Sequence, residues 1–222
     1  MELQPKKEIF DNRFLRNKEL IKQDSLSSVC IIGAGGIGSF VIQSLTMMGW
    51  GEISVWDADV MENHNVSSTA YPLSLIGRKK GEAAMVLHSL YADKSQSMTS
   101  YNRHYSPTDK AHPRTIICTD NMESRRMAFE EWFRLPDKEW FVDARMGATT
   151  VELVTESNRY ESPSALYKTN YISKYWQPTH TVPEAPCSMK HSVFATQHIA
   201  SLVTSQVYNL VAGLAYYDYI WT

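Results

Sequence analysis

The strongest constraint on the fold of this 222-residue chain is a glycine-rich turn near its start. The apolar run 29–32 enters the turn, and a helix-compatible segment from Ile37 to Met48 leaves it. Between them, Gly33, Gly35 and Gly38 fit the spacing G-x-G-x-x-G. A tight turn, a close backbone approach to phosphate and close helix–strand packing each exclude a side chain there. The turn therefore predicts a phosphate site at a helix N-terminus.

A second strand is expected directly after this helix. Gly49 and Gly51 end the helix, and residues 52–56 have the apolar character of a strand. This strand ends at Asp57, where an acidic side chain can accept hydrogen bonds from ribose hydroxyls. Together the three elements predict a nucleotide-binding βαβ unit, and a tight turn without a ligand is the structural alternative.

Strands and helices alternate along the rest of the chain. Further strands are expected at Ser97–Tyr105, Arg114–Cys118, Glu139–Asp143 and Thr149–Val154, and further helices at Gly77–Ala92, Met122–Phe133 and residues 190–212. This alternation is typical of an α/β fold. We expect one domain over residues 1–222, with a Rossmann-like, mostly parallel sheet, helices on both faces and antiparallel strands toward the C-terminal part.

Three segments lack the pattern of a core element. Residues 1–26 are charged, helical in character and without a strong apolar stripe, so we expect them to lie on a surface or a partner. Residues 59–76 are rich in Asn, Ser and His, which is typical of a functional loop. Residues 158–186 are aromatic and contain several prolines, and we interpret them as an irregular crossing loop.

Composition excludes several classes of function. The net charge is −2 at pH 7, which gives no electrostatic basis for binding nucleic acid or a membrane surface. No apolar run approaches the roughly 18 residues of a membrane span. Cys30, Cys118 and Cys187 show no C-x-x-C spacing, which argues against a structural zinc site and for a reducing compartment. The cytoplasm is the expected location.

A second group of motifs follows the glycine turn in a fixed order. It consists of Asp57-Ala58-Asp59, Asn65, a Gly-x-x-Lys helix start from Gly77 to Lys80, and Thr119-Asp120-Asn121 with Arg125. With the G-x-G-G-x-G form of the turn, this order resembles the ThiF/MoeB-type adenylating superfamily, which includes the adenylation domains of ubiquitin-activating enzymes. Asn12-Arg13 and Pro186-Cys187-Ser188 resemble two further motifs of that family. The resemblance thus extends over nearly the whole chain.

The resemblance implies an ATP-dependent adenylyltransferase that uses ATP and Mg²⁺. Its substrate would be the C-terminal carboxylate of a small ubiquitin-like or sulfur-carrier protein. The nucleotide-binding residues that it implies are Gly33, Gly35, Gly36, Gly38, Asp57, Asp59, Asn65, Lys80 and Asn121. The catalytic residues would be Arg13, Lys80, Asp120 and Cys187, with Asp120 as the metal ligand. The family also implies a homodimer in which Arg13, or Arg16 in its place, reaches the phosphates of the neighbour.

The chemistry agrees with this interpretation, although each residue has a structural alternative. Attack of a carboxylate on the α-phosphorus of ATP needs positioning and charge neutralisation, which Lys80 and a magnesium on Asp120 can supply. Alternatively, Lys80 is a solvated lysine and Asp120-Asn121 a helix cap. Cys187 is either a nucleophile, which His191 and His198 on the last helix could assist, or a structural residue.

Two other functions remain open. Many family members carry an Arg after the Asn, whereas residues 66–69 here are Val-Ser-Ser-Thr, and Ser68 stands at the point in question. The missing charge favours a catalytically degenerate nucleotide-binding module that docks a partner. An NAD-dependent Rossmann enzyme is the third hypothesis. The zinc cysteines of ThiF/MoeB-type proteins are absent too, so packing must hold that segment, and Tyr171, Tyr175 and Trp176 are the expected anchors.

Overall fold

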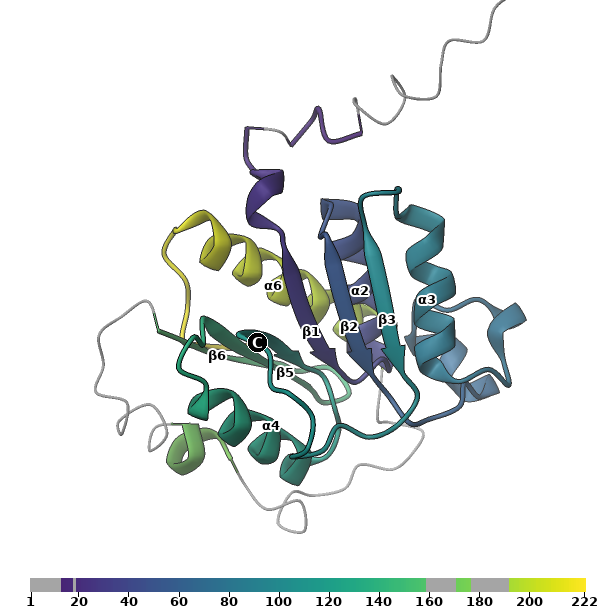
Figure 1. Cartoon of the computed structure of the whole chain (residues 1–222). Helices are drawn as coiled ribbons and strands as arrows, with labels where there is room; N and C mark the ends of the chain where they lie inside the picture. The colour runs from purple at the N-terminus through teal and green to yellow at the C-terminus, as the bar shows by residue number, and fades with distance from the viewer. Residues whose placement is uncertain (1–12, 18, 159–170, 177–191) are drawn as a thin grey trace, which may run out of the picture.

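A single seven-stranded sheet organises the fold (Figure 1). The computed structural model describes residues 13–17, 19–158, 171–176 and 192–222. The strands are β1 (Ser28–Ile32), β2 (Glu52–Trp56), β3 (Ser97–Tyr101), β4 (Arg114–Ile117), β5 (Trp140–Met146), β6 (Val151–Ser157) and β7 (Tyr219–Trp221), in the spatial order β3-β2-β1-β4-β5-β6-β7. The first five are parallel, and β6 and β7 are antiparallel to their neighbours. This confirms the mostly parallel sheet with antiparallel strands at the C-terminal side.

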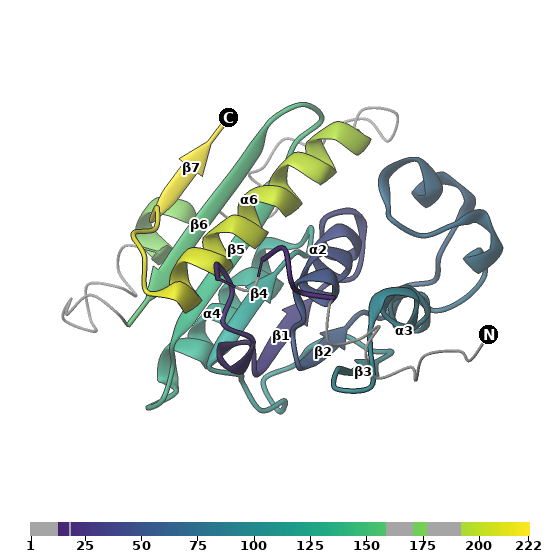
Figure 2. The same ribbon diagram turned by 90° about the horizontal axis from the view of Figure 1, so that it is seen from above.

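Helices cover both faces of the sheet, as predicted. In Figure 2 the helix α6 runs along the sheet on the opposite side from α4. The α-helices are α2 (Gly36–Met48), α3 (Lys80–Tyr91), α4 (Met122–Arg134) and α6 (Val193–Ala212). Buried side chains of α2, α3 and α6 share one hydrophobic cluster, whereas those of α4 belong to a second one.

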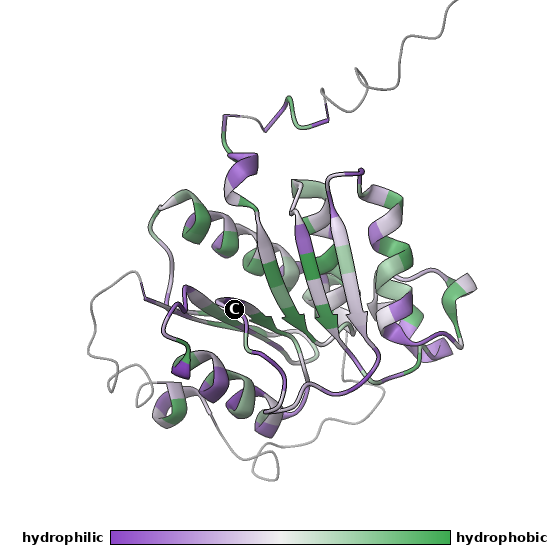
Figure 3. Ribbon diagram, in the orientation of Figure 1, coloured by the Kyte–Doolittle hydropathy of each residue, from purple (hydrophilic) through white to green (hydrophobic). Residues whose placement is uncertain are grey.

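The alternation along β1 explains why the core has two halves. Val29 and Ile31 belong to the first cluster, and Cys30 and Ile32 belong to the second. Because successive strand residues point to opposite faces, an unbroken apolar run is buried on both sides. Figure 3 shows the hydrophobic colouring along β1 and the purple, hydrophilic loops around it. Because β1 lies inside the sheet between β2 and β4, the glycine turn lies away from both outer strands.

Several boundaries differ from the predictions. The strand expected at Thr149–Val154 is β6, Val151–Ser157, because Gly147 to Thr150 form the turn that pairs it with β5. β7 was not predicted. The loop 59–76 contains two short 3₁₀-helices, η2 (Asn63–Ser68) and η3 (Leu73–Leu75).

The described part of the N-terminal segment is not an α-helix. It consists of turns and a 3₁₀-helix, η1 (Gln23–Ser25). Of the crossing loop 158–186, the structure describes Asn158 and a short stretch with the π-helix η4 (Tyr171–Tyr175). Within the described residues, no helix is long and apolar enough to span a membrane.

Candidate nucleotide site

The glycine turn joins β1 to α2, and three of its positions require glycine for different structural reasons. Gly33 has φ +98°, a left-handed conformation that side chains disfavour. A Cβ on Gly38 would lie 2.0 Å from the Gly33 carbonyl oxygen, so Gly38 permits the close helix–strand packing expected from the motif. A Cβ on Gly36 would come within 2.9 Å of Thr196 in α6. Packing within the protein therefore explains these three glycines.

Gly35 is different because the protein itself does not require it. A Cβ there would meet no atom within 4 Å. Gly35 is also the N-cap of α2, and no side chain caps this helix. The first amide groups of the helix therefore face open space with their donors and the positive end of the helix dipole. This is the arrangement that binds phosphate at helix N-termini.

Asp57 anchors the turn from the end of β2. Its Oδ2 accepts a hydrogen bond from the Ala34 amide at 2.7 Å, and its Oδ1 accepts one from the Asp59 amide at 2.8 Å. Burial raises the pKa of Asp57, and these two amide bonds and the charge of Lys80 oppose the rise. A carboxylate offers about four acceptor positions, so ribose hydroxyls can still bind it.

The sequence patterns missed two residues that hold the same turn. The Tyr71 hydroxyl donates to the Ala34 carbonyl oxygen at 2.9 Å, so both sides of residue 34 are fixed. Ser39 in α2 accepts from the Ala70 amide at 2.9 Å. Both contacts fasten the loop 59–76 to the glycine turn. No sequence spacing predicts these two contacts, because their partners are backbone groups far away in sequence. The one available signal is that a buried hydroxyl group needs a hydrogen-bond partner.

Lys80 lies beside Asp57 and Asp59 at the start of α3. Its Nζ forms an ion pair with Asp59 Oδ2 at 2.8 Å, and 13% of its side chain is exposed, against 63% for Asp59. This hydrogen bond is the main reason that the pKa of Asp59 is lowered. The pair holds a positive charge next to the glycine turn that an arriving phosphate can recruit.

Asn65 lies on η2, whose far end packs against the start of α2. Its Oδ1 accepts from the Glu62 amide at 2.9 Å in a capping box. Ser68 is buried, and a Cβ on Gly36 would lie 3.1 Å from its carbonyl oxygen. The segment that carries Asn65 and Ser68 therefore borders the N-terminus of α2. At Ser68, where many family members carry an Arg, this chain has a buried hydroxyl and no charge.

The motif Thr119-Asp120-Asn121 follows β4 and adjoins the same turn. A Cβ on Gly33 would lie 3.0 Å from the Cys118 carbonyl carbon and 3.1 Å from the Thr119 nitrogen. Asn121 is the N-cap of α4 and accepts from the Ser124 amide at 3.0 Å, which agrees with the structural alternative for that residue. Asp120 is exposed. The ends of β1, β2 and β4 thus bring the motif residues to one edge of the sheet.

Arg125, the last residue of that motif, is buried with a partner that was not predicted. It forms an ion pair with the fully buried Asp143 of β5 and donates to the carbonyl oxygen of Thr119. Burial alone would raise the pKa of Asp143, but Arg125 and Arg145 outweigh it and hold that pKa below its ordinary value. Arg125 therefore fixes the backbone just before Asp120.

Arg13 is not brought to this edge within one chain. It donates to the Thr46 carbonyl oxygen at 3.0 Å and to Gln96 at 2.8 Å, and it lies 3.4 Å from Asp93. Thr46 is ten residues after Gly36 along α2, which corresponds to about 15 Å of helix. A role for Arg13 at the phosphates of its own chain is therefore inconsistent with this position.

Two of the three cysteines and the predicted metal ligand Asp120 lie in the described part of the chain. Cys30 is buried and Cys118 is half-buried, and burial raises the pKa of both thiols, to about 12 for Cys118. Cys187 and His191 lie outside the described residues. Among the described residues, no group of three or more His, Cys, Asp or Glu side chains can hold a metal ion. Magnesium commonly needs one or two carboxylates together with substrate phosphates, so a role for Asp120 requires the nucleotide.

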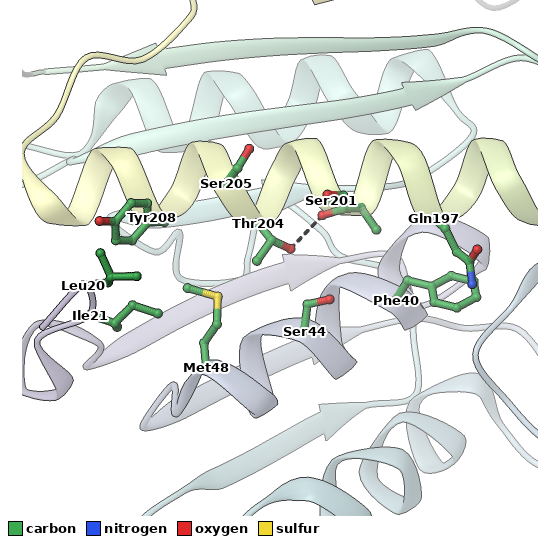
Figure 4. A pocket seen from close by; sticks show the side chains of 11 residues that line it. Leu20, Ile21, Phe40, Ser44, Met48, Gln197, Ser201, Thr204, Ser205 and Tyr208 are labelled. Atoms are coloured by element: carbon green, nitrogen blue, oxygen red, sulfur yellow. Dashed lines mark hydrogen bonds between the residues drawn. The ribbon is translucent and has the colours of Figure 1, made fainter. Parts of the chain in front are cut away.

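A groove of about 540 Å³ lies away from these residues. It runs between α2 and α6 and is closed at one end by the N-terminal segment (Figure 4). Its walls include Leu20, Phe40, Met48 and Tyr208. No residue of the predicted nucleotide site lines it.

The chain is similar to several known proteins. The model of the ThiF family matches residues 13–216. Ubiquitin-like modifier-activating enzyme 5 of Caenorhabditis elegans is 29% identical over 113 residues, which cover 44% of this chain and 27% of that protein. The corresponding enzyme of Bombyx mori is 27% identical over 142 residues, 57% of this chain and 35% of that protein. The chain thus matches about a third or less of the length of these relatives.

The fold also resembles solved structures. A crystal structure of PaaA superimposes with a TM-score of 0.73 at 16% identity, covering 100% of this chain and 72% of that one. Escherichia coli MccB crystallised with ATP gives a TM-score of 0.65 at 18% identity, covering 92% of this chain and 65% of that one.

Proposed function

The chain belongs to the ThiF family, and on this premise we propose that it is an ATP-dependent adenylyltransferase. Its proposed substrate is the C-terminal carboxylate of a small ubiquitin-like or sulfur-carrier protein. Support for this class comes from the curated relatives, which are ubiquitin-like modifier-activating enzymes, and from a crystal structure of E. coli MccB with MccA. The match covers only part of those relatives, so the substrate of the whole protein is part of the proposal.

One observation carries the proposal. An uncapped helix N-terminus with open space at Gly35 lies at the same sheet edge as Asp57, Lys80 and Asp120, which come from three other segments. Donors for phosphate, an acceptor for ribose, a lysine ammonium group and an exposed carboxylate are the groups that ATP and Mg²⁺ need. The residues present therefore fit both.

The proposed reaction is a displacement at phosphorus. A carboxylate oxygen of the partner attacks the α-phosphorus of ATP, the bond to the β-phosphate oxygen breaks, and pyrophosphate leaves with the bonding electron pair. The products are an acyl-adenylate and pyrophosphate. In this proposal the glycine-turn amides and Lys80 would neutralise the phosphate charge, and Asp57 would orient the ribose. Asn65 would donate a hydrogen bond near the phosphates, and Asp120 would hold Mg²⁺. Such preorganised charges supply most of the acceleration in reactions of this type.

A second step at Cys187 extends the proposal. Its thiolate would attack the acyl carbonyl carbon, and AMP would leave, so that a thioester joins the partner to the chain. Replacement of Cys187 by Ala should then keep pyrophosphate exchange and lose the thiol-linked adduct. If the variant retains the complete downstream reaction, Cys187 is structural.

We propose a twofold dimer because Arg13 cannot reach the nucleotide of its own chain. In a dimer its segment would reach the site of the neighbour, after release from Thr46 and Gln96. Mixing inactive Arg13→Ala and Lys80→Ala chains should restore part of the activity, because one site of the mixed dimer keeps both residues. A light-scattering mass of a single 25.3 kDa chain at micromolar concentration would contradict the dimer.

Pyrophosphate exchange tests the main proposal. Labelled pyrophosphate should enter ATP only when a carrier with a free C-terminal carboxylate is present. Lys80→Ala should lower the exchange rate about 100-fold, as removal of one transition-state charge donor commonly does. Lys94→Ala, an exposed lysine just after α3, is the matched control and should leave the rate unchanged.

Ser68 favours the second candidate, a degenerate module that binds ATP without turning it over. A buried hydroxyl there supplies no positive charge for the phosphates. ATP binding without exchange for every carrier tested would support this module. Tight binding of NAD in preference to ATP would instead support the oxidoreductase.

A further inference from the structure

The loop that carries Asp120 is held on both sides. Before Asp120, the Thr119 carbonyl oxygen accepts a hydrogen bond from Arg125. After it, the Met122 carbonyl oxygen accepts one from the Trp176 indole Nε1 at 2.9 Å. Asp120 itself is exposed, so the position of its carboxylate depends on how firmly this backbone is held.

The first of these contacts continues into the same downstream segment as the second. Arg125 is paired with Asp143 Oδ1, and Asp143 Oδ2 accepts from the Tyr171 hydroxyl at 2.8 Å. The Tyr171 ring is fully buried and stacks on Phe129 of α4, with the ring centroids 4.0 Å apart. Tyr171 therefore holds both the carboxylate that orients Arg125 and the helix that begins after Asp120.

Further contacts seat this segment on α4 and β5. The Arg126 guanidinium lies over the Trp176 ring, 4.8 Å from its centroid. Arg145 donates to the Tyr175 carbonyl oxygen at 2.5 Å and to Asp143 at 2.6 Å. Burial would lower the pKa of Arg145, but the charge of Asp143 outweighs it and raises that pKa. The segment 171–176 thus contacts a buried, fully charged network rather than apolar side chains alone.

We propose that Tyr171 and Trp176 are positioning residues for Asp120. They lie about fifty residues downstream, and their hydrogen bonds bracket the Thr119–Met122 loop through two independent routes. The inference rests on the proposed function for its consequence, since Asp120 is there the ligand of Mg²⁺. A merely structural role would anchor 171–176 without affecting the loop.

Amide hydrogen exchange in the free protein tests whether Tyr171 and Trp176 hold the Thr119–Met122 loop, and this test does not depend on catalytic activity. The Ser124 and Arg125 amides donate to Asn121, at 3.0 and 3.2 Å, so their exchange reports the position of the loop. Trp176→Phe and Tyr171→Phe each remove one donor and keep a ring. Each should speed exchange of these amides about fivefold relative to Val41 in α2, as loss of one hydrogen bond predicts.

The control is Tyr105→Phe, a buried tyrosine packed against Trp56 on the same face of the sheet. It should leave the protection of Ser124 and Arg125 at the wild-type value. Unchanged protection in Trp176→Phe and Tyr171→Phe as well would overturn the inference.

The metal dependence of exchange activity is the second measurement. Each of the two variants should raise the Mg²⁺ concentration for half-maximal pyrophosphate exchange about fivefold. The affinity for ATP without metal should stay at the wild-type value, because the glycine turn is untouched. An unchanged Mg²⁺ midpoint in an active enzyme would overturn the positioning role. If the wild-type chain shows no exchange with any carrier, the proposed function fails, and the amide measurement alone decides the inference.

Discussion

The two halves of the sheet edge hold their polar groups in different ways. Around β1 and β2 most contacts are to backbone, as where Asp57 accepts from two amides and Tyr71 donates to a carbonyl, and the ion pair of Lys80 has an exposed partner, Asp59. Around β4, β5 and β6 they are between charged side chains, with Arg125 and Asp143 buried as an ion pair. The first half leaves a helix N-terminus open, whereas the second neutralises its charges internally.

The difference shows what each half is built for. Backbone donors that remain unpaired at a helix N-terminus can bind an anion at little cost of reorganisation. A buried ion pair must be complete, because a single charge left without its partner is strongly unfavourable. We therefore expect substitutions at the open helix N-terminus of the first half to act mainly on ligand binding, and substitutions of the buried charges in the second half to act mainly on stability.

The largest expected effect is that of Asp143→Asn. The substitution keeps the shape and removes the charge, which leaves Arg125 and Arg145 without their common partner. The free energy of unfolding should fall by about 3–5 kcal/mol, as for other broken buried pairs. Urea denaturation measures it.

The control for this prediction is Glu130→Gln on α4, where the Glu130 side chain is 22% exposed. Its partner Arg126 is 46% exposed, so the loss should stay below about 1 kcal/mol. Equal losses in the two variants would remove the distinction between the buried network and an ordinary surface pair.

A smaller effect separates two glycines of the same turn. Gly38→Ala places a Cβ against the Gly33 carbonyl and should destabilise the fold by about 1–3 kcal/mol. Gly35→Ala meets no protein atom and should change stability by less than about 1 kcal/mol. Its added methyl group should nevertheless weaken ATP binding about tenfold, because it fills the space in front of the helix N-terminus.

Calorimetry with ATP and thermal unfolding measure the two glycine variants side by side. If Gly35→Ala binds ATP as well as the wild type, the open space at Gly35 is not where the nucleotide lies. The predicted phosphate site would then have to move away from the glycine turn.

The same contrast explains what the sequence could predict. Gly33 and Gly38 are recognisable because a turn and a close approach exclude side chains at fixed spacing, and the strand–turn–helix order around them follows from local patterns. The mostly parallel sheet was predictable for the same reason. The aromatic anchors Tyr171 and Trp176 were predictable as a class, since a segment without zinc ligands must be held by packing.

Their partners were not predictable. Arg125 and Asp143 are 18 residues apart, and Tyr171 and Asp143 are 28 apart, so no local period links them. Arg13 was assigned from a motif, and its contacts with Thr46 and Gln96 in the same chain could not be foreseen from it. β7 is too short to give a pattern of its own. Contacts between residues far apart in the sequence produce no local sequence pattern from which they could be predicted.

Glu156 shows what happens to a buried acid of this half without an arginine. It lies on β6, is 7% exposed, and its pKa is raised to about 8, first by burial and then by the charge of Asp218, while Lys174 opposes the rise. Asp143 is buried still more deeply, yet its pKa is lowered, because two guanidinium groups contact it. The partner, and not the depth of burial, decides which form of the acid the fold accepts.

The smallest expected effect is a change of the free energy of unfolding with pH, which follows from the raised pKa of Glu156. A carboxyl group whose folded-state pKa lies above its unfolded value of 4.5 contributes stability that is complete below pH 4.5 and is lost as pH rises through about 8. The contribution of Glu156 to the free energy of unfolding should therefore fall by about 1 kcal/mol per pH unit between pH 6.5 and 8. Burial lowers the pKa of His88 and His112, so their contribution to the free energy of unfolding rises as pH increases through the unfolded value of 6.5. Both histidines are also present in Glu156→Gln, so the difference between the wild-type and variant slopes isolates Glu156. Glu156→Gln cannot ionise and should flatten this slope in urea denaturation series at each pH. A slope that is the same in the variant and in the wild type would mean that Glu156 is ionised in the folded chain, and burial without an arginine would then be no different from burial beside one.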